Sequence, residues 1–426
     1  MTARQWKGRS IAAASLLAFA AILPGTSLSA GTDRLHPGPM SRADAYARAA
    51  ALTDLGRKLF FDPSLSASGR QACSSCHDPH HAFGPASAAS IEMGGPHLDL
   101  PGLRAVPSLR YIQAVPAFNE HFHDSDDEGD ESVDNGPTGG LTWDGRVDHG
   151  VDQAKIPLLS PFEMANKDAG AIAANLRKAP YADEFRAAFG DAVFDRPDDA
   201  LNAAAEALGT FEQGSADFYP YSSRYDAFLA GKATLTEQEM HGLELFEDEA
   251  KGNCASCHLS RPANDGEPPQ FTDFGLIGVS VPRNPAIPAN ADPSYFDLGL
   301  CGPLRTDFKG RAEYCGLFRT PSLRNVALRK SFFHNGTFHT LRDAVAFYAT
   351  RDTDPGHWYP KNADGTVDKF DDLPKAYWGN LNTDPPFNGK KPGDKPALTD
   401  AEIDDIVVFL GTLTDADQVA GAQAAR

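Results

Sequence analysis

Apolar side chains recur at helical spacing in three stretches of the chain. These are residues 42–60, residues 235–247 and residues 398–413. Thr236 and Thr399 stand where a helix N-cap is expected, and acidic residues follow Thr399 in the first turn. The pattern predicts a mainly α-helical protein.

Two of these predicted helices lead into the same short motif. A helix ending in a Leu-Phe pair precedes CSSCH at 73–77 and CASCH at 254–258. This internal repeat, in a chain of 426 residues, predicts two domains, which we assign to 31–232 and 233–426. The 38 Gly and 32 Pro indicate long loops between the helices.

Two long segments are predicted to be loops. Residues 121–140 are acidic and rich in glycine, which is typical of an exposed loop. Residues 352–397 are rich in Pro, Asp and Gly and contain Trp358 and Trp378, so we expect a long ordered loop over one surface.

The first 30 residues have the pattern of an export signal. Basic residues come first, an apolar run follows at 11–23, and small residues fill 24–30. Removal of 1–30 takes away three basic residues and changes the net charge from −19 to −22. A negative net charge of this size argues against a role in binding nucleic acid or an anionic membrane. We expect a periplasmic protein without a membrane span after the signal is removed.

Four of the six cysteines lie in the two CxxCH motifs. In an exported protein this motif indicates covalent attachment of haem c, with the histidine as an axial ligand of the iron. Cysteines three positions apart lie about one helical turn from each other, so both reach one porphyrin. Thioredoxin-like chemistry and a shared zinc site are the alternatives, but the first lacks a βαβ setting and 177 residues separate His77 from Cys254.

The other two cysteines, Cys301 and Cys315, lie in a glycine-rich segment. In an oxidising compartment a structural disulfide between them is expected, and two free thiols are the alternative.

Three further stretches resemble the bacterial di-haem cytochrome c peroxidase family, which includes the MauG proteins. They are residues 55–79, residues 141–164 and residues 317–348. The resemblance covers nearly all of the mature chain and implies two cytochrome c-like domains, each with one covalently bound haem c. It also implies that the first haem reacts with peroxide and that the second transfers electrons to it.

The resemblance assigns roles to three residues near the first haem. Glu163 and Gln153 would line its distal pocket opposite His77, and Trp143 would lie between the two haems. A carboxylate in a partly buried pocket suits the proton transfer that peroxide cleavage requires. For Glu163 taken alone, the alternative is a surface glutamate. For Trp143 taken alone, the alternative is a tryptophan packed in the core.

The two haem irons differ in the sixth axial ligand that the sequence predicts opposite the proximal histidine. Counting along the segment after the first motif leads to Met93 or His97 as a distal ligand of the first haem, or to neither. The position of the second haem's usual methionine ligand matches Tyr348, as in MauG, and an oxygen donor favours ferric iron. The alternative for Tyr348 is packing in the core.

Two positions depart from the family pattern. MauG carries a tryptophan before its second haem motif, where this chain has Gly252 and Asn253. The family's calcium site uses an asparagine where this chain has Ala105, so calcium has one side-chain ligand fewer, although backbone oxygens near Thr320 remain.

The sequence therefore predicts a periplasmic peroxidase that reduces hydrogen peroxide with electrons from a small cytochrome or copper protein. The alternatives are a MauG-like oxidase acting on a protein or organic substrate, favoured by Tyr348, and a plain electron carrier, disfavoured by Glu163. Family members are often homodimers, which makes a dimer an expectation from the resemblance alone.

Overall fold

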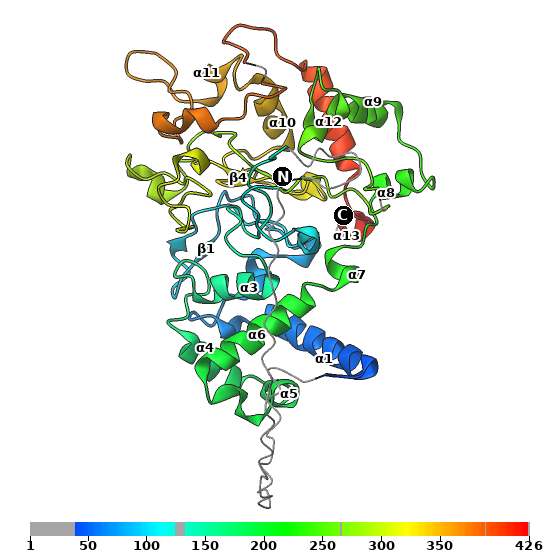
Figure 1. The fold of residues 1–426 in the computed structure, drawn as a ribbon, viewed down its shortest axis with the longest axis vertical. Coiled ribbons are helices and arrows are strands. Elements are labelled where there is room, and N and C mark those ends of the chain that lie inside the picture. Colours follow the sequence, from blue (N-terminus) through cyan, green and yellow to red (C-terminus); the bar gives the residue numbers. More distant parts are fainter. Residues whose placement is uncertain (1–38, 124–132, 265, 388, 425–426) are drawn as a thin grey trace, which may run out of the picture.

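The computed structural model describes residues 39–123, 133–264, 266–387 and 389–424. It is mainly helical, as predicted (Figure 1). The α-helices are α1 (Arg42–Phe60), α2 (Cys73–Cys76), α3 (Gly150–Leu159), α4 (Ala169–Lys178), α5 (Ala182–Phe189), α6 (Pro197–Phe211), α7 (Ser215–Phe218), α8 (Arg224–Leu229), α9 (Glu237–Glu247), α10 (Leu341–Thr350), α11 (Pro355–Trp358), α12 (Asp400–Gly411) and α13 (Ala416–Ala424).

Strands are short and few in the described chain. β1 (Met93–Gly94) pairs antiparallel with β2 (Leu100–Pro101), and β3 (Leu276–Ile277) pairs antiparallel with β4 (Phe318–Arg319). Short 3₁₀ turns include η2 (Pro79–His81), η5 (Cys254–Ser256) and η9 (Lys375–Asn380). The sheets are therefore local ties between loops, and the helices form the framework.

The three predicted helices are confirmed as α1, α9 and α12. The Thr236 hydroxyl accepts a hydrogen bond from the Glu239 backbone nitrogen, and Thr399 does the same for Glu402, so both predicted N-caps are present. Each cap is a full capping box, because the glutamate side chain returns to the backbone nitrogen of the threonine.

A helix crossing is repeated in the two halves of the molecule. α1 crosses α6 at Gly56, where a Cβ atom would lie 2.0 Å from the Ala207 carbonyl oxygen. α9 crosses α12 at Gly242, where a Cβ atom would lie 2.1 Å from the Asp405 carbonyl oxygen. Glycine lets the backbones touch at both crossings, so the sequence repeat is also a structural repeat.

Buried apolar side chains form two large cores, carried by halves of the chain that lie one above the other in Figure 1, and a third, small core around the Cys301–Cys315 pair. The first contains buried side chains between Leu52 and Phe218, and the second contains those between Tyr225 and Leu413. The segment between α7 and α8 joins the two halves, and α13 returns to contact η2 in the first half.

The loop predictions are partly correct. His121 and Val133 to Asn135 are exposed, but Pro137 to Gly140 are buried, because the backbone of Thr138 pairs with Asn119 and Gly275. The segment 352–397 contains α11 and η9 in addition to loops. The predicted signal, residues 1–30, lies outside the described residues.

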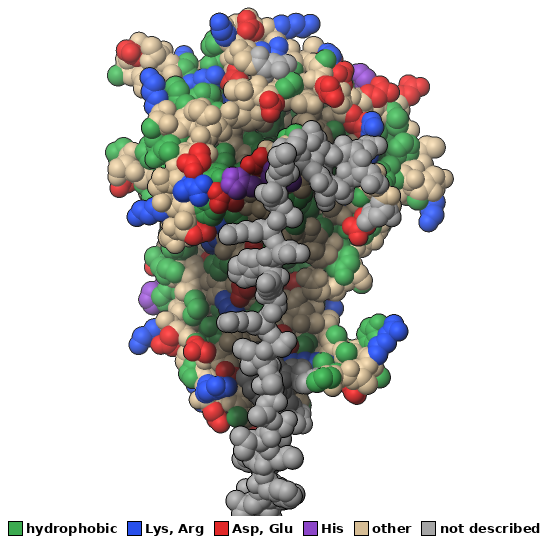
Figure 2. Space-filling model, viewed as in Figure 1, with side chains coloured by type: hydrophobic (Ala, Val, Ile, Leu, Met, Phe, Trp, Pro, Cys, Tyr) green, Lys and Arg blue, Asp and Glu red, His purple; other side chains and the backbone are tan. Residues whose placement is uncertain are grey.

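Within the described part of the chain, no helix has both the length and the apolar character needed to cross a membrane. Acidic and basic side chains are interspersed on the face seen in Figure 2.

Candidate functional site

The first CxxCH motif lies in the wall of a cavity of about 530 Å³, within the range of cofactor sites. α2 and its C-cap place the motif there, since the His77 backbone nitrogen donates to the Cys73 carbonyl oxygen. The same cavity is also lined by the three residues to which the sequence assigns roles near the first haem: Trp143, Gln153 and Glu163. Folding thus brings together groups that lie up to 90 positions apart in the sequence.

A backbone oxygen fixes the orientation of each motif histidine. His77 Nδ1 lies 3.0 Å from the Phe83 carbonyl oxygen, and His258 Nδ1 lies 2.9 Å from the Phe271 carbonyl oxygen. Each arrangement leaves Nε2 available as a metal ligand. Phe83 and Phe271 both have a φ of 53°, a conformation that a bulky residue seldom adopts. Burial lowers the pKa of both imidazoles to about 4 and keeps them neutral.

Glu163 is held by the turn that follows α3. Its backbone nitrogen donates to the Ser160 carbonyl oxygen, and its own carbonyl oxygen accepts from the Gly95 backbone nitrogen. The side chain is accessible from the cavity that it lines. Loss of solvation raises the pKa of Glu163 above its usual value, and the Ser160 side chain and the charge of Arg146 oppose this shift only in part.

A second carboxyl group in the first cavity was missed from the sequence. Glu212, at the end of α6, is 5% exposed and lines the cavity, and no hydrogen bond to its Oε2 atom is present among the described residues. Burial raises its pKa to about 8, so Glu212 is mostly protonated at neutral pH. No signal in its sequence neighbourhood distinguishes it from a surface helix residue.

The second CxxCH motif lines another cavity, which is narrower, at about 250 Å³. Cys254 begins η5 and Cys257 is its C-cap, and the His258 backbone nitrogen donates to the Cys254 carbonyl oxygen. Tyr348, on α10, lines the same cavity. Its ring packs against Phe387, but within the described chain no hydrogen bond to its hydroxyl is found. Burial raises the pKa of Tyr348.

The residues that line both cavities, and therefore lie between them, are Pro107, Ser108, Ile112, Trp143 and Arg319. The Trp143 indole nitrogen donates to the Ala105 carbonyl oxygen over 2.8 Å, and the Arg319 backbone nitrogen donates to the Trp143 carbonyl oxygen over 2.8 Å. The first contact ties the indole to the first half of the chain, and the second ties its backbone to β4 in the second half.

The charges around the cavities fit a cofactor that carries carboxylates. Arg319 and Arg329 form no ion pair with any described residue, and loss of solvation lowers the pKa of each to about 10. Both line the second cavity, and Arg319 also lines the first. An enclosed arginine without an acidic partner is costly unless a ligand supplies the negative charge. Haem carries two propionates, so these two arginines are suited to hold them.

The two candidates for a distal ligand of the first haem are placed differently. Met93 lines the first cavity, although 46% of it is exposed, and its carbonyl oxygen accepts from the Gln71 side chain. His97 is exposed and lines neither cavity. Of the two, only Met93 is near the first CxxCH motif.

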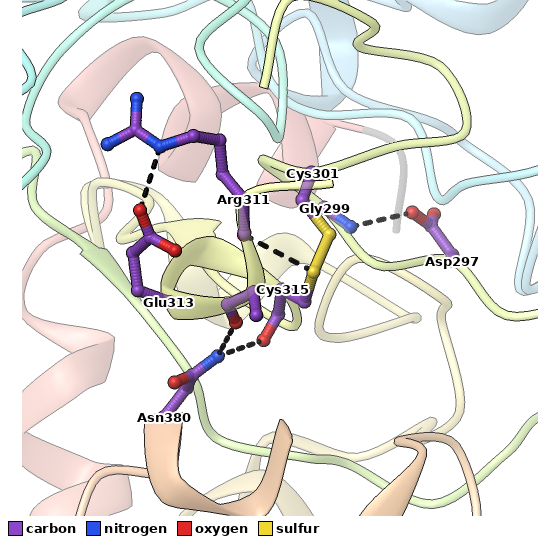
Figure 3. Close-up of a disulfide and its surroundings, with 8 residues drawn as sticks. Asp297, Gly299, Cys301, Arg311, Glu313, Cys315 and Asn380 are labelled. Atoms are coloured by element: carbon purple, nitrogen blue, oxygen red, sulfur yellow. Dashed lines mark hydrogen bonds and ion pairs between the residues drawn. A yellow bond between two sulfur atoms is a disulfide. The ribbon is translucent and has the colours of Figure 1, made fainter. Parts of the chain in front are cut away.

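The remaining cysteines, Cys301 and Cys315, form a disulfide (Figure 3). The Asn380 side chain, on η9, donates to the carbonyl oxygens of Ala312 and Cys315 beside it. A shared zinc site is excluded, because the two pairs of motif cysteines line separate cavities.

At the position of the family's asparagine ligand and at Thr320, the backbone oxygens are engaged in other contacts. The Ala105 carbonyl oxygen accepts from Trp143, and the Thr320 carbonyl oxygen accepts from the Thr272 hydroxyl. In the ranges that the structure covers, no cluster of three or more His, Cys, Asp or Glu side chains could hold a metal ion.

Comparison of the sequence with known proteins identifies the family and several relatives. The family model described as di-haem cytochrome c peroxidase matches residues 50–234. The methylamine utilization protein MauG of Paracoccus denitrificans is 35% identical over 376 residues, which cover 86% of this chain and 89% of the relative. The cytochrome c551 peroxidase of Pseudomonas aeruginosa is 30% identical over 295 residues, which cover 69% of this chain and 70% of the relative.

Solved structures agree with the sequence relatives. The diheme peroxidase BthA from Burkholderia thailandensis is similar with a TM-score of 0.76 and 42% identity, covering 86% of this chain and 87% of that chain. A MauG-like protein associated with microbial copper homeostasis is similar with a TM-score of 0.60 and 26% identity, covering 89% of this chain and 92% of that chain.

Proposed function

Because the chain belongs to the di-haem cytochrome c peroxidase family, an oxidoreductase family with two haem c cofactors, we propose that it reduces hydrogen peroxide at the first haem. Electrons would reach that haem from the second one. In this proposal Cys73 and Cys76 bind the first haem covalently, and Cys254 and Cys257 bind the second. His77 and His258 are the proximal ligands.

One observation carries this proposal. Glu163, Gln153 and Trp143 line the cavity of the first CxxCH motif, and Trp143 also lines the cavity of the second. A protein that only carries electrons has no use for a carboxylate facing its haem, so the arrangement favours peroxide chemistry over an electron carrier.

Haem iron, when bound, supplies the site at which peroxide binds and its oxygen–oxygen bond breaks. Glu163 takes a proton from the peroxide oxygen nearer the iron and returns it to the leaving oxygen, which departs as water. The pKa of Glu163 is raised and therefore lies closer to neutral pH, which suits a group that first accepts a proton and then returns it. Gln153, one turn into α3, orients the peroxide through its carboxamide.

Trp143 passes electrons between the two cofactors. Its indole can be oxidised, and its position in the wall of both cavities shortens the path. Arg319, which lines both cavities, would hold a haem propionate and would supply a positive charge near the path of the electrons.

A second candidate function is supported by Tyr348. Its hydroxyl is free of hydrogen bonds to the described residues and lies in the wall of the cavity that contains His258. An oxygen ligand stabilises oxidised iron, so Tyr348 suits a MauG-like oxidase that stores two oxidising equivalents and acts on a protein or organic substrate. Gly252 and Asn253, where MauG has a tryptophan, weigh against the same substrate route.

The test is to add peroxide to the purified diferric protein and to follow its absorption spectrum. A reaction only after half-reduction supports the peroxidase, and a long-lived species holding two equivalents without reduction supports the MauG-like oxidase. The absence of any reaction contradicts both functions. The variant Glu163→Gln, which keeps the shape of the side chain, serves as the matched control for proton transfer.

The remaining assignments follow from this function. We propose export to the periplasm through residues 1–30, and a small cytochrome or copper protein as the electron donor. Met93 is the nearer candidate for a distal ligand, and its exposed position suits a displaceable one.

A further inference from the structure

Three tyrosines lead from the second cavity to the surface. Tyr111 lines this cavity and is 2% exposed. Its ring centroid lies 5.0 Å from that of Tyr221, which lies 6.4 Å from that of Tyr219. Tyr219 and Tyr221 are half-buried, and the Tyr219 hydroxyl donates to the Gln213 carbonyl oxygen in an exposed contact. The three rings therefore form a continuous series from the wall of the second cavity toward solvent. Tyr219 and Tyr221 lie in the segment after α7, which joins the two halves of the chain in Figure 1.

A buried carboxylate is ready to accept the proton of the innermost tyrosine. The Tyr111 hydroxyl donates to Asp415 Oδ1 over 2.7 Å. Asp415 is fully buried, and its other oxygen accepts from Arg110 and from Asn325. Oxidation of a phenol releases its proton, so an acceptor already in hydrogen-bond contact makes loss of an electron easier. Tyr111 is the only member of the series with a carboxylate partner of this kind.

A cation lies against the same rings, and its charge is balanced. The Arg324 guanidinium lies 4.7 Å from the ring centroids of both Tyr111 and Tyr221. An isolated positive charge there would oppose the loss of an electron. Asp226 binds both terminal nitrogens of Arg324, at 3.0 and 2.9 Å, and compensates that charge.

The surroundings of Tyr221 also fit a change of protonation. Its hydroxyl accepts from the side-chain nitrogens of Gln113 and Gln270, at 3.2 and 2.8 Å. The Oε1 atoms of both glutamines are buried, and no hydrogen bond to either is found among the described residues. A half-turn of either amide would give the Tyr221 hydroxyl an acceptor.

We propose that Tyr111, Tyr221 and Tyr219 form a redox relay that carries oxidising equivalents from the second haem to the protein surface. This inference rests on the proposed function, because peroxide is the oxidant. Tyr111 gives one electron toward the cavity and its proton to Asp415, and it recovers both when Tyr221 supplies the next electron. Tyr221 and then Tyr219 release their protons to water and regain them on reduction. A one-electron donor in contact with Tyr219 closes the sequence, so the donor is oxidised without entering either cavity.

The relay is tested by trapping radicals in the holoprotein. Peroxide is added to the diferric protein without a donor but with a nitroso spin trap, and peptide mass spectrometry locates the adduct. We expect an adduct on Tyr219 that is lost in Tyr221→Phe. The absorption of the oxidised haems should decay more slowly in both Tyr221→Phe and Tyr219→Phe. Tyr219→Phe removes only a surface hydrogen bond, so folding does not limit this test.

Tyr46→Phe is the matched control, because Tyr46 lies on α1 and is 63% exposed. It should leave both the adduct and the decay unchanged. An adduct on Tyr219 that persists in Tyr221→Phe, or one found only on the exposed Trp378, overturns the relay. A spectral change without any tyrosine adduct overturns the relay alone, and no spectral change in the unaltered protein overturns the proposed function together with it.

Discussion

The indole nitrogen of Trp143 donates a hydrogen bond to the carbonyl oxygen of Ala105 over 2.8 Å. The residue that departs from the family's calcium pattern is thus the residue that holds the tryptophan between the cavities. The contact uses a backbone atom, so it does not depend on which side chain occupies position 105. It fixes the ring of Trp143 at the boundary of the two haem sites.

Replacing Trp143 by phenylalanine should slow electron transfer between the haems while both haems remain bound. Phenylalanine fills most of the same space but is much harder to oxidise and cannot donate to Ala105. Stopped-flow absorption of the half-reduced protein after peroxide addition measures the transfer. Equal rates in the variant and the unaltered protein would contradict a role for the indole.

Replacing Glu163 by glutamine should lower the rate of reaction with peroxide by about 100-fold or more, the usual contribution of general acid–base catalysis. Glutamine keeps the size of the side chain but cannot accept the proton. The initial rate of spectral change, measured at several peroxide concentrations, gives the rate constant for the reaction with peroxide. Glu92→Gln, a change to another carboxyl group that lines the same cavity, is the comparison and should have a much smaller effect.

The peroxide reaction should also report the titration of Glu163. Loss of solvation in the cavity raises its pKa above the usual value of about 4.3, although the residue is accessible from that cavity. Only the ionised carboxylate accepts a proton, so the rate falls as the pH drops through the raised pKa, and the fall begins at a higher pH than an exposed glutamate would give. A pH series of the same rate measures this step, which Glu163→Gln should lack. A step at or below about 4.3 would count against the assignment.

Replacing Tyr348 by phenylalanine should change the low-spin haem signal in electron paramagnetic resonance. The hydroxyl is the only polar atom of the side chain, so its removal takes away the proposed oxygen ligand while the ring can still pack against Phe387. The signal of the first haem should be unaffected. An unchanged low-spin signal would return Tyr348 to the alternative of core packing.

Replacing Gly242 by alanine should lower the free energy of unfolding by about 1–3 kcal/mol. The added Cβ would lie 2.1 Å from the Asp405 carbonyl oxygen, so α9 and α12 must move apart. Chemical denaturation measures the change. Gly411→Ala on α12 is the control, because no atom lies within 4 Å of its added Cβ, and it should not destabilise the protein. Similar losses in both variants would contradict the crossing as the cause.

Much of this molecule was predictable from short segments. The helices around Thr236 and Thr399 follow from local capping and periodicity, and the CxxCH motifs carry their chemistry in five consecutive residues. Glu163 was found because a whole segment resembled a known family. The clustering of this segment with His77 around one cavity depends on tertiary packing.

The residues that were missed have no local signature. Glu212 looks like an ordinary residue at a helix end, and Arg319 and Arg329 look like surface charges. Only folding encloses these side chains, so that among the described residues the two arginines have no partner of opposite charge and one oxygen of Glu212 has no hydrogen bond. The burial at the end of the 121–140 segment has a similar cause, since the backbones of Asn119 and Gly275, both outside the segment, pair with Thr138.

The matching contacts of His77 with Phe83 and of His258 with Phe271 have a consequence for the division of labour between the two irons. Both imidazoles are oriented by the same kind of backbone acceptor at nearly the same separation, so their electron-donating strength should be almost equal. A large gap in reduction potential would therefore originate in features that differ between the two cavities, such as the group opposite each histidine and the nearby charges, and not in the orientation of the histidines. Exchanging the functions of the two haems would require redesign of those surroundings, with both histidines left untouched.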